Sequence, residues 1–340
     1  MAYGWDDMIE EFRTLGGAAD NIVQRVGTRG RGIFPIDNAK PIRLHVPENL
    51  LIPVEDIEFV DDRLRIRGAS AVGAAERDFV ERYEDAFSWG AGGRTDCAAF
   101  LEGMKHLELE ASTHSVVSPL VACVRAHTRS RDSVGQRFLE SRTILRNDAA
   151  VLMPLMELVN HDPFAPPYDV RGGVAIGGVF QDEVLVRYTI QDAFGMFMNF
   201  GFASAEPMAF GLTMDHPASS KPDADRRIVI KRDMVFKGKL GSFDVPEFKI
   251  EGGILTLSCL MLGATRAPRL PRSIFFTLLK DAGWQSWAEE FDRIAHANRI
   301  VFLDMLGSIE AREGEFAVTV RRALRHQLSA LSFYFGIRQL

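Results

Sequence analysis

The stretch that organises this chain runs from Ser141 to Phe202 and reads SRTILRNDAAVLMPLMELVNHDPFAPPYDVRGGVAIGGVFQDEVLVRYTIQDAFGMFMNFGF. Its apolar segment, 149–159, ends abruptly at Asn160-His161-Asp162-Pro163, so polar side chains stand at the close of a buried segment. A short β-forming run, 183–188, follows and ends in Tyr188, one of five tyrosines in the chain. Polar residues placed at the ends of buried segments are the first candidates for a functional site.

Composition restricts the class of protein. The chain has 340 residues, of which 46% are hydrophobic and 25% charged, as expected of a globular protein with more than one core. A net charge of −6 argues against nucleic acid as the main partner, because phosphate binding requires a basic surface. Cys97, Cys123 and Cys259 are odd in number and widely spaced, so they indicate neither a disulfide framework nor a zinc cluster. Residues 1–20 lack a signal-peptide pattern and no apolar run is long enough to span a membrane, so we expect a soluble, cytoplasmic protein without a membrane partner.

Residues 21–53 are rich in β-branched and turn residues, which predicts two or three short strands after a helix within residues 1–19. Gly27, Gly30 and Gly32 fall at a turn between these strands. Glycine allows the backbone to approach a ligand closely, although an ordinary glycine turn explains this piece equally well. The order G-x-x-G-x-G is not the G-x-G-x-x-G fingerprint of dinucleotide-binding proteins, so NAD is not expected.

Helical spacing of apolar residues dominates two regions. Between residues 63 and 140 it predicts three or four helices, and after a mixed region at 208–252 it predicts helices at 254–262, 271–279, 284–296, 300–312 and 316–335. His106, His114 and His127 lie in the first region without the i, i+4 spacing of metal-binding helices. No metal site is expected.

Five motifs follow one another in a specific order along the chain. They are Arg29-Gly30-Arg31-Gly32-Ile33-Phe34 with the later Leu44-His-Val-Pro47, Ser141-Arg142, PLMELVNH at 154–161, Tyr188, and Asn199-Phe200-Gly201-Phe202. This order resembles the SET domain of S-adenosylmethionine-dependent protein methyltransferases, specifically the subgroup of the Rubisco large-subunit lysine methyltransferase. Five matches in family order, spanning about residues 25 to 205, are hard to obtain by chance.

The resemblance implies an α+β chain, with a SET-domain fold of short β-sheets, a helical insertion, and a mostly α-helical C-terminal domain. We expect the N-terminal half of the SET domain at 1–62, the insertion at 63–140, the C-terminal half at 141–210, and a mostly helical, substrate-docking-like domain at 211–340. This subgroup carries a helical insertion at that position, which agrees with the helical spacing between residues 63 and 140.

The same resemblance implies the activity of a protein-lysine N-methyltransferase that uses S-adenosylmethionine and has a protein as its substrate. The residues implied to bind the cofactor are Gly30, Arg31, Gly32, Arg142, Asn160 and His161. The Asn160-His161 backbone would bind the adenine edge, the Asn160 side chain would contact the amino-acid end, and Arg142 would pair with the carboxylate. Phe200 and Phe202 would line the substrate pocket.

Tyr188 is assigned the catalytic position. Methyl transfer from a sulfonium to nitrogen is an in-line displacement, so positioning provides most of the catalysis and the amine must be neutral. A lysine amine, with an ordinary pKa near 10.4, therefore needs a desolvated, apolar channel or a path for its proton through water. A tyrosine hydroxyl both donates and accepts hydrogen bonds, and with an ordinary pKa near 10 we expect it to orient the amine rather than to act as a base.

Several positions depart from the family pattern. Glu157 replaces an aspartate, Asp162 replaces a serine and adds a negative charge, and Asp192 replaces an asparagine. Phe200 replaces a tyrosine that often lines the pocket of the target nitrogen, so the pocket lacks one hydroxyl. Two other functions therefore stay open. One is methylation of a protein histidine, whose imidazole has an ordinary pKa near 6.5 and becomes neutral more easily than a lysine amine. The other is a SET-like binding module with weak or no catalysis.

Overall fold

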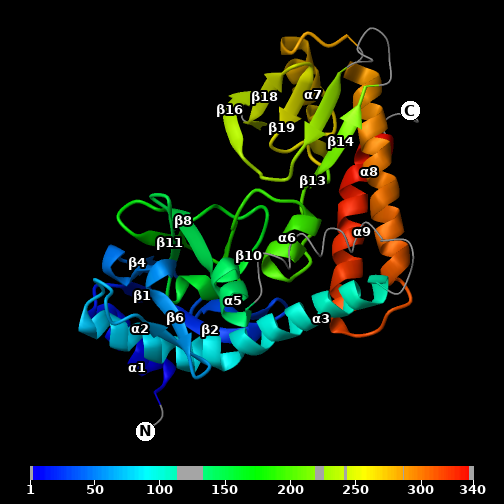
Figure 1. The fold of residues 1–340 in the computed structure, drawn as a ribbon. Coiled ribbons are helices and arrows are strands. Elements are labelled where there is room, and N and C mark those ends of the chain that lie inside the picture. Colours follow the sequence, from blue (N-terminus) through cyan, green and yellow to red (C-terminus); the bar gives the residue numbers. More distant parts are fainter. Residues whose placement is uncertain (1–2, 113–132, 219–225, 241–242, 286, 337–340) are drawn as a thin grey trace. The chain divides into compact units, whose positions relative to one another are not determined.

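The computed structural model describes residues 3–112, 133–218, 226–240, 243–285 and 287–336. Within these residues the chain forms two compact units (Figure 1). The first contains residues 3–106 and 133–189, and the second contains residues 107–112 and 190–336. Helix and strand are mixed in the chain, as predicted.

The first unit is built from several small sheets (Figure 1). Strands β1-β4-β11 and β5-β9-β8 form three-stranded sheets, β2–β3 and β6–β7 are hairpins, and β10 pairs with β12 in parallel. The bounds are β1 Ala18–Asp20, β2 Ile22–Gly27, β3 Gly30–Pro35, β4 Ile42–Val46, β5 Ile52–Pro53, β6 Ile57–Val60, β7 Arg63–Ile66, β8 Thr143–Arg146, β9 Ala149–Leu152, β10 Asn160–His161, β11 Val174–Gly178 and β12 Leu185–Val186. These short strands agree with the β-sheets expected from the sequence.

Four helices are described in or at the edge of the first unit: α1 Trp5–Thr14, α2 Ala74–Phe87, α3 Arg94–Ser112 and α5 Val134–Arg142. Helix α1 is the N-terminal helix predicted from the sequence, and it buries Met8 and Phe12. The expected helical region from 63 to 140 begins with a strand instead. Asp61 and Asp62 both have positive φ, 47° and 63°, which closes a tight β6–β7 hairpin. His114, Cys123 and His127 lie outside the described residues.

An apolar core holds the small sheets of the first unit together. Buried side chains from different sheets meet in it, among them Ile33, Leu44, Leu152, Val159 and Val186, each 0% exposed. Because each short strand contributes little stability by its own pairing, burial of these side chains has to fix the strand positions. The strand ends that carry the polar motifs are therefore anchored by the core on their buried side.

The second unit contains a strand-rich part and three long helices (Figure 1). Strands β14-β15-β19-β18 form a four-stranded sheet, and β13–β20 and β16–β17 form pairs. The bounds are α6 Ala193–Phe200, β13 Met208–Phe210, β14 Met214–Pro217, β15 Arg227–Ile230, β16 Phe236–Leu240, β17 Phe243–Pro246, β18 Phe248–Glu251, β19 Ile254–Leu257, β20 Met261–Ala264, α7 Leu270–Asp281, α8 Trp287–Ile309 and α9 Glu315–Gly336. From Leu270 the described residues form the helices α7, α8 and α9, as expected of the C-terminal region.

Two helix predictions in the second unit were wrong in detail. The segment 254–262 forms β19 and the start of β20, because Gly252 and Gly253 have positive φ and turn the chain into a β18–β19 hairpin. A short apolar run of this length fits a buried strand as well as a helix. The helices predicted at 284–296 and 300–312 are one helix, α8, whose buried face continues through Phe302 and Met305.

Residues 190–210 pack with the second unit, before the predicted domain boundary at 210. Asp192 explains this packing. Its carboxylate is 0% exposed and accepts hydrogen bonds from the backbone of Gly195 and Phe210 and from the side chains of Arg232 and Gln327. It is thus the N-cap of α6 and joins that helix to β13 and α9. The substitution of asparagine by Asp192 is accommodated by a full set of donors.

Candidate active site

The parallel pairing of β10 with β12 brings the two central motifs together. Asn160 lies opposite Leu185 and His161 opposite Val186, so Tyr188 follows two residues after the paired segment. The backbone N–H of Tyr188 donates to His161 Nδ1 at 3.1 Å, and the two rings lie 5.2 Å apart. His161 is buried, and this bond makes Nε2 the protonated nitrogen of its neutral ring. His161 therefore fixes the backbone position of Tyr188.

A strained turn precedes β10. Leu155 has φ 65° and ψ −43°, and Met156 N–H donates to Pro154 C=O at 2.8 Å, which defines a γ-turn of the rare, positive-φ kind. Leu155 is fully buried, so packing holds this conformation. Backbone strain of this kind costs on the order of 1–3 kcal/mol and is concentrated at functional sites. The turn directs Glu157 into the core and places Asn160 at the strand end.

The Asn160 side chain is fixed by both of its N–H groups. Asn160 Nδ2 donates to Arg31 C=O at 3.0 Å and to Glu183 Oε1 at 2.6 Å. The amide orientation follows from these two acceptors. Among the described residues no hydrogen bond reaches Asn160 Oδ1, and the residue is partly exposed. The side chain therefore presents a hydrogen-bond acceptor and no further donor.

Gly32 is required by this arrangement. A Cβ at position 32 would lie 2.3 Å from Glu183 Oε1 and 2.7 Å from Asn160 Nδ2, closer than Cβ atoms approach other atoms in proteins. Gly30 has a different reason to be glycine, because its φ is +90° at the end of the β2–β3 turn. Arg31 contributes its carbonyl to Asn160, while its guanidinium lies 3.9 Å from the Asp96 carboxylate. The glycine motif thus contacts the Asn160 motif directly.

Glu183 is a residue of this site that the sequence did not single out. Its side chain is only 3% exposed, and besides Asn160 it pairs with Arg29 at 3.3 Å. Arg29 also pairs with Asp162 at 3.4 Å. Asp162 caps its turn as well, since Asp162 Oδ1 accepts from Phe164 N–H at 2.8 Å. The position of Glu183 at the start of the run that ends in Tyr188 is the signal that could have identified it.

The Tyr188 hydroxyl donates to Val159 C=O at 2.6 Å. Burial raises the pKa of Tyr188 to about 12; the Arg142 guanidinium opposes this shift, and the Glu157 and Glu183 carboxylates add to it. The phenol is therefore neutral at physiological pH. Its proton is directed at a backbone carbonyl, and a hydroxyl oxygen can accept hydrogen bonds as well as donate one.

Arg142 belongs to a buried polar cluster beside Tyr188. Arg142 Nη1 donates to Glu157 C=O at 3.1 Å. Burial lowers the pKa of Arg142, but neighbouring groups, first of them the Glu157 carboxylate, outweigh burial, so the pKa is raised above its ordinary value. Glu157 accepts from Tyr83 at 2.8 Å, and Glu84 lies in the same cluster. Burial and then the Glu157 charge raise the pKa of Glu84 well above its usual range. One oxygen each of Glu84 and Glu157 has no hydrogen-bond partner among the described residues.

Phe200 and Phe202, the predicted pocket residues, belong to the second unit. Phe200 is the last residue of α6, and Gly201 with φ 84° ends the helix, so Phe202 follows the turn. Their ring centroids are 6.1 Å apart and the planes are tilted by 35°. The two rings form one aromatic pair at the C-terminal end of α6.

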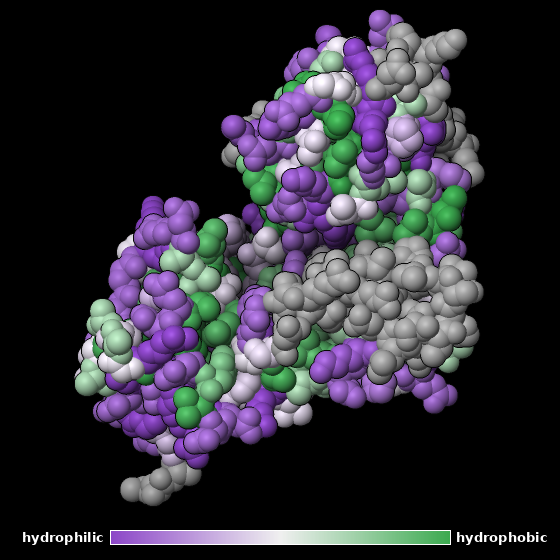
Figure 2. Space-filling view, in the orientation of Figure 1, coloured by the Kyte–Doolittle hydropathy of each residue, from purple (hydrophilic) through white to green (hydrophobic). Residues whose placement is uncertain are grey.

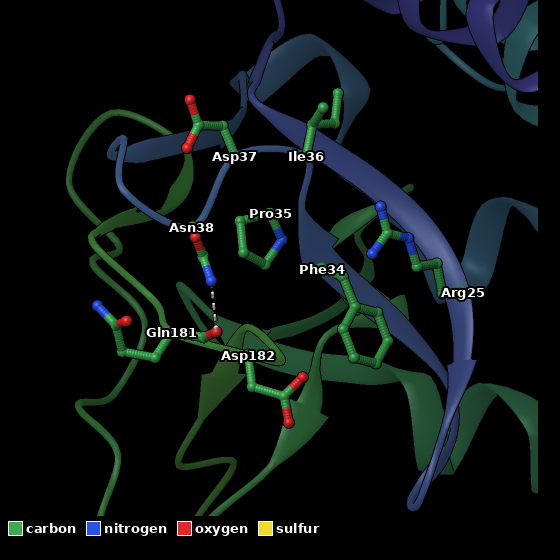
Figure 3. Close-up of a pocket in the computed structure, with 8 residues that line it drawn as sticks. All are labelled: Arg25, Phe34, Pro35, Ile36, Asp37, Asn38, Gln181 and Asp182. Atoms are coloured by element: carbon green, nitrogen blue, oxygen red, sulfur yellow. Dashed lines mark hydrogen bonds between the residues drawn. The ribbon is translucent and has the colours of Figure 1, made fainter.

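A hollow of about 420 Å³ opens beside the β2–β3 hairpin (Figure 3). Its lining includes Arg25, Phe34, Gln181 and Asp182, and Asn38 donates across it to Gln181 C=O at 3.4 Å. None of the predicted site residues lines this hollow. It adjoins the site in sequence, because Asp182 precedes Glu183.

The described part of the chain shows neither a candidate metal site nor a candidate membrane-spanning helix. It contains no group of three or more His, Cys, Asp or Glu side chains arranged to hold a metal ion. No helix in those residues is long and apolar enough to cross a membrane. Cys97 and Cys259, the two described cysteines, are buried and form no disulfide. The surface of the chain is mixed in polarity on the face drawn in Figure 2.

Comparison with known proteins gives matches to solved structures alone. No family model and no curated protein matches the chain. One similar structure is the SET domain of LSMT bound to lysine and AdoHcy, with 14% identity and a TM-score of 0.47. Another is Rubisco LSMT bound to sinefungin and monomethyllysine, with 13% identity and a TM-score of 0.43. Each comparison covers 97% of this chain and 90% of the other.

Both structures are of LSMT. Because both TM-scores and both identities are low, the similarity does not by itself assign an activity to this chain. The assignment has to rest on the residues of the site.

Proposed function

We propose that this protein is an S-adenosylmethionine-dependent protein-lysine N-methyltransferase. The observation that carries the proposal is the pairing of β10, which contains Asn160, with β12, which ends two residues before Tyr188. Asn160 offers a fixed acceptor beside the buried Glu183 carboxylate, and Tyr188 offers a neutral hydroxyl oxygen. A hydrogen-bond acceptor beside a carboxylate can bind the ammonium of an amino acid. A neutral hydroxyl can form a hydrogen bond with an amine and can lie against a methyl group.

The residues present fit the proposed cofactor. Glu183 and Asp162 carry two negative charges and Arg29 one positive charge, so the cluster has a net charge of −1 beside Asn160. S-adenosylmethionine is cationic at its sulfonium and ammonium, and it supplies the methyl group when bound. Asn160 and the backbone of Gly30 to Gly32 would hold its amino-acid end. Arg142 donates to Glu157 C=O, so its proposed pairing with the carboxylate would use its remaining N–H groups.

Tyr188 would orient the target amine. Its hydroxyl, which donates to Val159 C=O, would accept from a lysine N–H and direct the nitrogen lone pair toward the methyl group. With a pKa of about 12, the phenol is a poor candidate for the base at neutral pH. The lysine would therefore lose its proton to solvent before transfer, favoured by desolvation in an apolar channel.

The proposal is tested with the Tyr188→Phe variant and methyl-labelled S-adenosylmethionine, using proteins from a cell extract as acceptors. We expect loss of labelling with cofactor affinity retained. The variant also leaves Val159 C=O without its donor, so its fold is checked by circular dichroism. Tyr3→Phe is the matched control, since among the described residues the Tyr3 hydroxyl donates to Glu11 on α1. Full labelling by Tyr188→Phe would refute the assignment.

The pH dependence of labelling separates lysine from histidine as the target. A lysine amine becomes more reactive as pH rises toward its ordinary pKa near 10.4, whereas imidazole is already neutral above about pH 6.5. Labelling that falls steeply below pH 8 supports lysine. Labelling that persists toward pH 6 supports a histidine methyltransferase instead, and cofactor binding without labelling at any pH supports a binding module.

A further inference from the structure

We infer that Glu183 is a positioning residue that makes the Asn160 side chain selective for an ammonium group, with Arg29 setting the strength of that selectivity. The inference rests on the proposed function and names how one end of the cofactor is recognised. Neither Glu183 nor Arg29 contacts the reacting atoms in this account. Both act through the Asn160 amide and through their charges.

The first step is the direction of the amide. Asn160 Nδ2 spends both hydrogens on Glu183 Oε1 and Arg31 C=O, at 2.6 and 3.0 Å. If the amide were flipped, Oδ1 would face two acceptors, which is repulsive. Glu183 is charged and close, so it is the stronger of the two constraints. The carbonyl oxygen of Asn160 must therefore be the atom offered to a ligand.

The second step is the charge behind that oxygen. Glu183 is 3% exposed, whereas Asp162 and Arg29 are 27% and 43% exposed. Water screens a buried charge least, so the Glu183 carboxylate dominates the local field. A hydrogen bond accepted by a carboxylate also polarises the amide and makes Oδ1 a better acceptor. A cationic donor is favoured there, and an anionic or uncharged group is not.

The third step is the counter-charge. The Arg29 guanidinium lies 3.3 Å from the Glu183 carboxylate and 3.4 Å from the Asp162 carboxylate, and the Arg29 side chain is half exposed. Both distances are longer than those of a strong charge-assisted hydrogen bond. Arg29 offsets part of the negative charge without displacing the Asn160 amide from Glu183 Oε1, because it binds Glu183 Oε2. Removing Arg29 should therefore increase selectivity for an ammonium, and neutralising Glu183 should decrease it.

The test is a cycle that changes the protein and the ligand together. Calorimetry measures the affinity of S-adenosylhomocysteine and of its analogue in which hydrogen replaces the α-amino group. The wild-type protein should prefer the amine by at least about tenfold, the worth of one charge-assisted hydrogen bond. Glu183→Gln should reduce this preference to about threefold or less, because it removes the negative charge that attracts the ammonium. Arg29→Ala should increase the preference, because it removes a positive charge that repels the ammonium.

Asp182→Asn is the matched control. It removes the same charge one residue away, from an exposed side chain that lines the separate hollow (Figure 3), and should leave the preference unchanged. Glu183→Gln that weakens both ligands equally would overturn the inference, because a merely structural role lowers affinity without altering the preference. A folded wild-type protein that binds neither ligand would overturn the proposed function as well, so the two failures are distinguishable.

Discussion

Replacing Gly32 with alanine should damage both the fold of the first unit and cofactor binding. The added Cβ would lie 2.3 Å from Glu183 Oε1 and 2.7 Å from Asn160 Nδ2, so the carboxylate and the amide would have to separate from β3. Overpacking costs about 1–3 kcal/mol, and losing a hydrogen bond to a charged group costs about 1.5–3 kcal/mol. Taken together these give a loss on the order of 3 kcal/mol.

The assays are thermal unfolding and calorimetric titration with S-adenosylhomocysteine. For a unit of this size, about 3 kcal/mol lowers the Tm by roughly 6–12 °C. Affinity should fall by at least about tenfold, because the Asn160 acceptor moves. Gly68→Ala is the control: it is exposed, its added Cβ would meet nothing within 4 Å, and its Tm should match the wild-type value. A Gly32→Ala variant with unchanged Tm and affinity would refute the packing described around Asn160.

Three further predictions concern the polar groups of the two units. The folded-state pKa of Glu84 is raised above its unfolded value of 4.5, so its stabilising contribution is present below about pH 4.5 and is lost as pH rises. In urea unfolding of the wild type, the free energy of unfolding should therefore decrease by up to about 1.4 kcal/mol for each unit of rising pH, and the profile of Glu84→Gln should be flatter. Identical profiles for the two proteins would contradict a raised pKa of Glu84. Asp192→Ala should destabilise the second unit by about 3–5 kcal/mol, because the buried Arg232 charge loses its partner; a Tm within 2–3 °C of wild type, corresponding to about 1 kcal/mol, would be inconsistent with that pairing. Since the pKa of Tyr188 is about 12, labelling by the wild-type protein should show no decline from ionisation of Tyr188 up to pH 10. A decline in wild-type labelling with a midpoint near pH 8 would contradict a phenol that stays neutral.

Much of the first unit could be predicted from the sequence. Hydrophobic runs that end in polar residues indicated the strand ends, and the order of the motifs indicated that Asn160 and Tyr188 belong together. The structure places Asn160 on β10 and Tyr188 two residues after β12, the strand that pairs with β10. The signal was strong because it is local: each motif lies within a few residues, and its apolar neighbours are buried in the core.

Glu183 and Glu84 could not be assigned in the same way. Glu183 reaches Gly32 across the fold, and Glu84 reaches Glu157 from α2, so their surroundings depend on pairings between distant segments. A glutamate side chain is usually solvated, so neither residue was expected to be buried, although Glu183 stands at the start of the β-forming run that ends in Tyr188. The strands β19 and β20 were missed for a related reason: a run of nine apolar and small residues suits either structure until its sheet neighbours are known.

Asp192 shows how a departure from a family pattern can be read in two ways. From the sequence it was grounds for weaker catalysis. In the structure its carboxylate has four donors and joins α6 to the rest of the second unit. The charge has a structural partner in Arg232, 40 positions away in sequence, which the sequence alone does not reveal.

The measurement that tests the central claim most directly is calorimetric titration of the purified protein with S-adenosylmethionine, repeated with Asn160→Ala. It requires no knowledge of the protein substrate. We expect binding at one site in the wild type and loss of that binding in a folded Asn160→Ala variant. Absence of binding to a wild-type protein shown to be folded would contradict the proposed function, and undiminished binding in Asn160→Ala would contradict the site described around that residue.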